Sequence, residues 1–172
     1  MKKIIFPMFV LMLIAGSSCQ EKIDIEKEKE AIKAVIEGEI KASFDGDYET
    51  WTTFFVHEPY TFWLQASQER YSNWKGWEEI SSTAKDFIKP DRAGSVIHEG
   101  NYDYTIRVYK EAALVTFKSK ITDIEEEETS EYIGLEVRFL EKQDGEWKIT
   151  YLGTVYSSTY KEEGMKSEEP EE

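Results

Sequence analysis

Cysteine and histidine are scarce in this chain, which has one cysteine, Cys19, and two histidines, His57 and His98. An internal disulfide is therefore excluded. Two histidines far apart in the sequence, with no cysteine beside either, do not form the ligand set of a structural zinc site. The sequence also lacks a phosphate-binding loop, a GxGxxG motif and a GxSxG nucleophile elbow. We therefore expect no cofactor and no metal ion.

Positive charge is the second scarcity. The chain has 21 Lys and Arg residues against 35 Asp and Glu, and its formal net charge is −14. So acidic a surface repels phosphate backbones, and nucleic acid is not an expected partner. It also repels anionic lipid headgroups, so a link to a membrane would depend on an anchor. Long apolar runs are scarce as well, since the only one is Ile4 to Ala15.

That run belongs to the first nineteen residues, MKKIIFPMFVLMLIAGSSC. Basic Lys2 and Lys3 precede the apolar run, and the small residues Gly16-Ser17-Ser18 follow it. This order indicates a secretory signal peptide, too short and wrongly flanked for a membrane-spanning helix. The segment resembles the signals of Bacteroidota lipoproteins, in which the cysteine carries the lipid, although Gly16 stands where leucine is usual. The alternative is ordinary cleavage nearby, which would leave Cys19 as a free thiol.

These patterns predict four parts of the chain. They are a lipoprotein signal peptide over 1–18, a tether over 19–23, one folded domain over 24–160, and a disordered acidic tail over 161–172. We expect the protein to be anchored by lipid on Cys19 in the cell envelope, at the periplasmic or surface-exposed face of the outer membrane. The membrane is then a partner through the anchor alone.

Three helices are predicted in the first half of the domain. The first covers about 24–45, because apolar residues recur there at helical spacing, and Gly46 suits its C-terminal cap. Asp47 suits the N-cap of a short second helix. The third begins near Trp77 and ends before Pro90.

Strand patterns occupy most of the remaining domain. They cover 60–65, then 96–109, 112–122, 130–141 and 147–158, with a polar loop over 66–73 and an Asp144-Gly145 hairpin turn. Helices grouped before a run of strands predict an α+β fold, with three N-terminal helices packed on a curved antiparallel sheet.

Two stretches resemble a known family. AIKAVIEGEIKASFDGDYETWTTFFVHEPYTFW and DGEWKITYLGTVYSS are similar to the first helices and the last strand of the nuclear transport factor 2-like superfamily, which includes ketosteroid isomerases and SnoaL-like cyclases. The resemblance implies a cone-shaped domain with a pocket at its open end. It also implies a homodimer through the convex face of the sheet. It leaves function open, because this fold hosts unrelated chemistries.

The candidate site residues are mostly aromatic. His57 is the candidate catalytic residue, as a general base in the pocket, and the alternative is a structural role at the end of the short helix. Glu136 and Arg138 share one face of a strand, where they are either a pocket pair or partners on the convex face, and we favour the convex face. Trp63 and Trp147 are expected in the core. The candidate pocket residues are Trp51, Tyr60, Trp74, Trp77, Tyr104 and Tyr151.

Two functions remain open at this point. The first is an envelope lipoprotein that binds a small apolar or aromatic molecule in the cone. The alternative is an isomerase, dehydratase or cyclase that acts on an apolar substrate with His57 as general base.

Overall fold

The computed structural model describes residues 23–90, 96–125 and 128–157. The signal peptide, Cys19 and the acidic tail lie outside these residues. No helix in the described ranges is both long and apolar enough to cross a membrane. The elements in chain order are α1 (Ile25–Phe44), α2 (Tyr48–Thr52), β1 (Phe62–Ala66), β2 (Tyr71–Lys75), α3 (Trp77–Phe87), β3 (Val96–Tyr109), β4 (Ala112–Glu125), β5 (Glu128–Gln143) and β6 (Glu146–Ser157).

The helix boundaries follow from their capping residues. Asp24 precedes α1 and accepts a hydrogen bond from the Lys27 backbone N–H at 3.3 Å. After α1, Gly46 adopts a φ of +72°, and a Cβ there would lie 2.5 Å from the Lys89 carbonyl, so glycine is required. Asp47 then caps α2 by accepting from the Thr50 N–H at 3.0 Å. The predicted helices and both predicted caps are confirmed.

The six strands form one sheet in the order β2-β1-β6-β5-β4-β3. The β1–β6 pair is parallel and the other pairs are antiparallel, so the sheet is mixed and not purely antiparallel as expected. The predicted loop over 66–73 is wrong at both ends, because Ala66 belongs to β1 and residues 71–73 belong to the edge strand β2. Four of the five residues of this strand are exposed, which explains its polar sequence. Trp74 is the exception, and its ring centroid lies 4.5 Å from that of Trp63.

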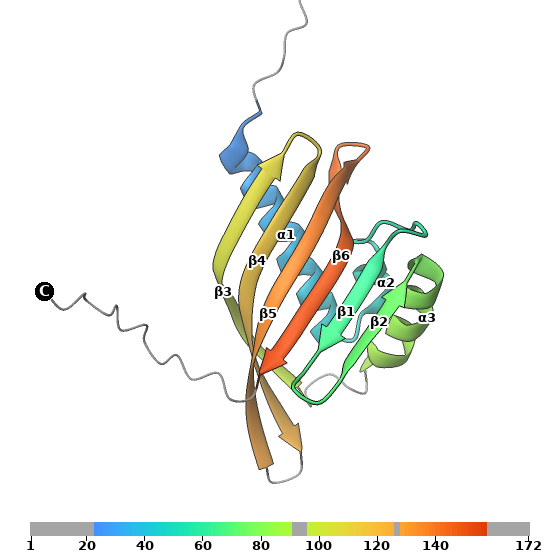
Figure 1. Cartoon of the computed structure of the whole chain (residues 1–172), viewed down its shortest axis with the longest axis vertical. Coiled ribbons are helices and arrows are strands. Elements are labelled where there is room, and N and C mark those ends of the chain that lie inside the picture. The colour runs from blue at the N-terminus through green and yellow to red at the C-terminus, as the bar shows by residue number, and fades with distance from the viewer. Residues whose placement is uncertain (1–22, 91–95, 126–127, 158–172) are drawn as a thin grey trace, which may run out of the picture.

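One face of the sheet is covered by helices. In Figure 1, α1 runs behind β3 to β6 and α3 lies beside β2, whereas no described helix covers the face toward the viewer. The core fills the space between α1 and the covered face. A bulge in β6 at Thr150 shifts the register, so Trp147 and Ile149 point inward before it, and Leu152 and Thr154 point inward after it.

The open face of the sheet is apolar at its centre. Register places Phe62, Tyr151, Phe139 and Leu114 in one row across β1, β6, β5 and β4. Two parallel rows are Leu64–Gly153–Val137–Thr116 and Ala66–Val155–Leu135–Lys118. Leu135 is 51% exposed, Phe139 46% and Val155 47%. We call the side chains of these three rows the open-face patch.

Candidate functional site

A cavity of about 160 Å³ lies between the C-terminal half of α1 and the inner face of the sheet. Residues from every strand except β2, together with the end of α3, form its wall. The lining residues are Glu39, Ile40, Ser43, Phe44, Trp51, Trp63, Gln65, Phe87, Ile88, His98, Ser119, Ile121, Glu136, Arg138, Leu152, Thr154 and Tyr156.

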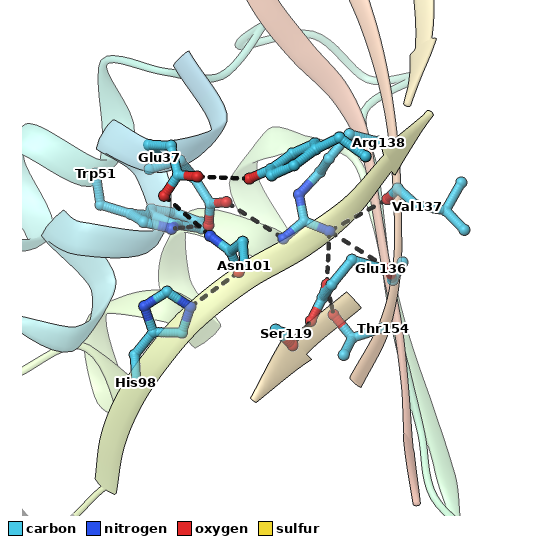
Figure 2. Close-up of polar contacts among 12 residues, drawn as sticks. Glu37, Trp51, His98, Asn101, Ser119, Glu136, Val137, Arg138 and Thr154 are labelled. Atoms are coloured by element: carbon cyan, nitrogen blue, oxygen red, sulfur yellow. Dashed lines mark hydrogen bonds and ion pairs between the residues drawn. The ribbon is translucent and has the colours of Figure 1, made fainter. Parts of the chain in front are cut away.

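Three charged side chains form a buried network in this wall, which we call the Glu39–Arg138–Glu136 triad. Arg138 Nη1 donates to Glu136 Oε2 at 2.9 Å, and Nη2 donates to Glu39 Oε2 at 3.3 Å (Figure 2). Each of the three side chains is at most 5% exposed. Charged groups so deeply buried are costly unless they are paired and hydrogen-bonded.

Neutral donors complete the network around the two carboxylates. Glu39 Oε1 accepts from the Trp51 indole N–H at 2.9 Å. Glu136 accepts from Ser119 Oγ at 2.8 Å and from Thr154 Oγ1 at 2.7 Å (Figure 2). The network therefore joins α1, α2, β4, β5 and β6, and it fixes the carboxylates in place at the cavity wall.

The structure places Glu136 and Arg138 inward, which corrects the preference for the convex face. The sequence pattern misled because Leu135, Val137 and Phe139 alternate with the charged pair, and the apolar residues are normally the inward set. Here the apolar set forms part of the open-face patch. The inward-facing charged pair is tolerated because Glu39 on α1 forms an ion pair with Arg138.

His98 is the histidine of the cavity wall. Its ring stacks on Phe44 at 5.2 Å between centroids, and its Nε2 lies 2.9 Å from Asn101 Oδ1. Asn101 Nδ2 donates to Glu37 Oε2 at 3.0 Å, which fixes Asn101 Oδ1 as an acceptor and places the proton on His98 Nε2 (Figure 2). Bulges in β3 at His98/Gly100 and Tyr102/Thr105 accommodate this arrangement.

Two ionisable groups at the cavity have shifted pKa values. Burial raises the pKa of Glu39 above its usual value, although Arg138 and the Trp51 N–H oppose the shift. Burial likewise raises the pKa of the Tyr156 phenol, which therefore stays neutral at physiological pH. Removing the Glu39 carboxylate from water therefore costs more free energy than its attraction to Arg138, its one cationic partner, supplies.

Two buried donors of the lining residues have no acceptor among the described residues, Trp63 Nε1 and Arg138 Nε. Trp63 is 6% exposed and lines the cavity, and its indole Nε1 has no hydrogen-bond partner among the described residues. A buried N–H without an acceptor costs about 1–3 kcal/mol. Neither nitrogen has surface that a molecule in the cavity could reach. Trp147, the other tryptophan expected in the core, is buried and donates to Glu28 Oε2 at 2.7 Å.

The structure separates most of the candidate residues predicted from the sequence. Trp51 lies in the cavity wall. His57 is exposed, stacks on Trp77 at 3.9 Å and bonds the Thr52 carbonyl at 2.9 Å through Nε2, so it lies outside the cavity. Tyr60 is exposed and donates to Glu141 at 2.6 Å. Because His57 lies outside the cavity, it does not contact a ligand bound there.

The other candidates serve packing. Trp77 packs its indole on Phe55, and Trp74 packs on Trp63. Tyr104 donates to Glu37 at 2.7 Å and stacks on Phe117. Tyr151 belongs to the open-face patch, where its ring lies 5.6 Å from that of Phe62.

Sequence reasoning missed Glu39, the residue that completes the triad. A signal for it was present, because Glu39 stands in the apolar stripe of α1 between Ile36 and Ile40. A glutamate at that spacing is either exposed by a local irregularity or buried with a partner. His98 offered no comparable signal. Its place depends on the bulges of β3, and bulges leave little trace in hydrophobic periodicity.

Metal chemistry has no support in the described ranges, where no group of three or more His, Cys, Asp or Glu residues is placed to hold a metal ion. The cavity wall presents paired carboxylates, one guanidinium, one imidazole and hydroxyl groups.

Comparison with known proteins yields solved structures only. No family model matches the chain, and no curated protein matches it. A nuclear transport factor 2-like superfamily protein from Salmonella enterica is 20% identical, with a TM-score of 0.57 over 83% of this chain and 98% of that one. An NTF2-like protein from Novosphingobium aromaticivorans is 13% identical, with a TM-score of 0.60 over 79% of this chain and 86% of that one.

The association domain of C. elegans CaMKII is also similar, with 17% identity and a TM-score of 0.61 over 75% of this chain and 95% of that one. Identities of this size establish the fold and leave the activity open. The helices packed on a curved, mixed six-stranded sheet, together with these likenesses, show that the chain has the nuclear transport factor 2-like fold.

Proposed function

We propose that this protein binds a small molecule in the cavity between α1 and the sheet. The observation that carries the proposal is the Glu39–Arg138–Glu136 triad in the wall of an unfilled space of about 160 Å³. A core that served stability alone would be filled with apolar side chains. Buried ion pairs often stabilise no better than apolar residues of the same volume, so their presence beside a cavity favours a binding role.

The composition of the cavity wall supports the same proposal. Convergent polar groups in a largely apolar concave site are the usual composition of a ligand pocket. The aromatic rings of Phe44, Trp51 and Trp63 supply the apolar part of the wall. This differs from the apolar pocket expected from the sequence, because charged groups form part of the wall.

A fragment screen tests the proposal. Ligand-observed NMR with a panel of neutral, anionic and cationic fragments of about benzene size would be run on the wild type and on Ser43→Phe, which fills the cavity. Ser82→Phe is the matched control, because Ser82 is exposed on α3. We expect hits that bind wild type and Ser82→Phe but not Ser43→Phe. Hits that bind all three equally, or no hits, would contradict a cavity ligand.

A second candidate function is catalysis in the same cavity, and the position of His98 favours it. With its proton on Nε2 held by Asn101 and Glu37, His98 keeps Nδ1 as a lone-pair base. An isomerase, dehydratase or cyclase would need such a base. This candidate replaces His57 with His98, because His57 lies outside the cavity.

Turnover of cavity ligands separates the two candidates. Each fragment that binds would be incubated with the protein and followed by NMR. An enzyme would convert at least one fragment, and His98→Gln would abolish conversion while binding persists. Conversion that survives His98→Gln would contradict the role of His98 as a base.

We further propose that the domain forms a homodimer through the open-face patch. Leu135, Phe139 and Val155 of this patch are exposed in the single chain, and no described helix covers them. Exposed apolar patches of this kind typically mark interaction sites. The similar CaMKII domain is named for association, which fits an assembling use of this fold.

We also propose that lipid on Cys19 anchors the protein to the cell envelope. The support is the order of basic, apolar and small residues before the only cysteine. Metabolic labelling with an alkyne fatty acid tests it. The wild type should take up label and partition into detergent, and Cys19→Ala should do neither. An unlabelled wild type in the aqueous phase would contradict the anchor.

A further inference from the structure

The cavity wall carries an unbalanced negative charge when both carboxylates are ionised. Among the lining residues, Glu39 and Glu136 are acidic and Arg138 is their single cationic partner. The other donors to the carboxylates are neutral, namely the Trp51 indole N–H and the Ser119 and Thr154 hydroxyls.

No lysine and no second arginine stands among the lining residues to offset this charge. His98 on β3 is engaged with the side-chain oxygen of Asn101 through Nε2. Burial raises the pKa of the Tyr156 phenol on β6, so this side chain stays neutral. A ligand with one positive charge would therefore neutralise the excess negative charge of the cavity wall.

The walls around the triad suit an organic cation. The rings of Phe44, Trp51 and Trp63 line the same space, and aromatic faces attract ammonium groups through their quadrupoles. Such contacts are worth about 2 kcal/mol when the pair is shielded from water. Carboxylates beside aromatic rings thus favour an alkylammonium group over a neutral alkyl group of the same shape.

The cavity volume limits the size of the ligand. A space of about 160 Å³ is close to cavities that hold benzene, so the enclosed part of the ligand has about six to eight non-hydrogen atoms.

We propose that the cavity binds a small alkylammonium ion, with its charge beside Glu39 and Glu136. This inference rests on the proposed binding function and names the chemical class of its ligand. The raised pKa of Glu39 agrees with it, because a bound cation would supply the compensation that Arg138 alone does not give.

A pair of isosteric probes tests the charge directly. Choline is a small alkylammonium alcohol, and 3,3-dimethylbutan-1-ol has the same shape with carbon in place of the charged nitrogen. Both would be titrated by calorimetry into the full-length protein in non-ionic detergent at about pH 8. We expect choline to bind about tenfold tighter or better, and to shift the indole N–H resonance of Trp51, which donates to Glu39, in ¹⁵N spectra.

Two glutamate variants locate the effect. Glu39→Gln should weaken choline binding about tenfold and leave the alcohol nearly unchanged. Glu30→Gln is the matched control, because Glu30 is exposed on the same helix and its loss changes the net charge equally. It should leave both probes unchanged. If Glu39→Gln does not fold, the comparison of the two probes on the wild type still decides the question.

The outcomes separate this inference from the proposed function. If the neutral alcohol binds as tightly as choline, the charge inference is overturned while binding in the cavity stands. If choline does not bind at millimolar concentration, the inference is overturned whatever the alcohol does. The proposed function itself fails only if the wider fragment panel gives no hit that Ser43→Phe removes.

Discussion

At the residue scale, the main feature is a guanidinium that holds two carboxylates from different layers. Arg138 on β5 contacts Glu136 on its own strand and Glu39 on α1. Its guanidinium also lies 5.5 Å from the Phe117 ring centroid. Removing one member of such a network leaves a buried charge without its partner, which costs more than the network contributes as a whole. Comparing the stability of a variant that lacks Arg138 with that of a variant that lacks an exposed arginine therefore tests whether the triad is ionised.

Arg138→Met should destabilise the fold by about 3–5 kcal/mol, because both glutamates would lose their cationic partner. Arg107→Met is the matched control, since Arg107 is exposed on β3, and it should change stability by less than about 0.5 kcal/mol. Urea unfolding followed by tryptophan fluorescence measures both. Equal midpoints for the two variants would show that Arg138 does not compensate a buried charge.

Glu39 should make stability depend on pH in a defined direction. Its pKa in the folded state lies above its usual 4.5, so the folded chain holds this proton more tightly than the unfolded chain. The contribution is fully present below about pH 4.5 and is lost as pH rises through the folded-state pKa. Glu39→Gln removes this loss, so the variant should gain stability relative to wild type as pH rises from about 4 to about 8.

Unfolding midpoints across that range check the sign for Glu39. Glu30→Gln supplies the baseline, because it removes an exposed carboxylate from the same helix. A difference between Glu39→Gln and wild type that stays constant with pH, or moves the other way, would contradict a raised pKa.

At the element scale, the sequence predicted the elements that have strong local signals. Capping residues and helical periodicity located α1 and α2, and β-branched alternation located β3 to within its observed bounds. β2 was missed because an edge strand of polar residues has no periodic signal. The site was harder to predict, since it depends on which face of β5 turns inward. That choice is made by the partner on α1, and local pattern carries no information about it.

The corner between α1 and α2 provides a test of close backbone packing. Gly46→Ala should cost more than about 2 kcal/mol, because its φ of +72° is strained for alanine and its Cβ would meet the Lys89 backbone. Gly145→Ala is the control. Gly145 has a φ of +88° with no atom near the added Cβ, so only strain of about 1 kcal/mol is expected.

Thermal or urea unfolding of the two glycine variants separates sterics from strain. The excess cost at Gly46 measures how firmly the end of α3 and the segment that follows it are held against the corner. Similar costs at the two glycines would show that the Lys89 backbone moves away at little expense.

At the scale of the whole molecule, both faces of the sheet depart from the usual pattern, in which apolar side chains face the core and charged side chains face solvent. Its inner face carries Glu136 and Arg138 of the buried triad, and its outer face carries the open-face patch. Both follow from the register of β5, in which Glu136 and Arg138 turn in while Leu135, Val137 and Phe139 turn out. The same register therefore produces the candidate cavity and the candidate interface. A binding function and an assembly function are supported by separate faces and can be tested separately.

Phe139→Glu tests the proposed dimer at the centre of the open-face patch. Phe139 pairs with Tyr151 and Leu114 on the neighbouring strands, so a carboxylate there would be desolvated in any interface built on this face. Sedimentation of the domain without residues 1–19 should give a dimer for wild type and a monomer for this variant. Ile25→Glu is the matched control, because Ile25 is 42% exposed at the start of α1, away from the sheet, and should leave the dimer intact. Ligand affinity in the cavity should be the same for both variants, since neither residue lines it. A monomeric wild type, or a Phe139→Glu variant that remains a dimer, would exclude the open-face patch as the interface.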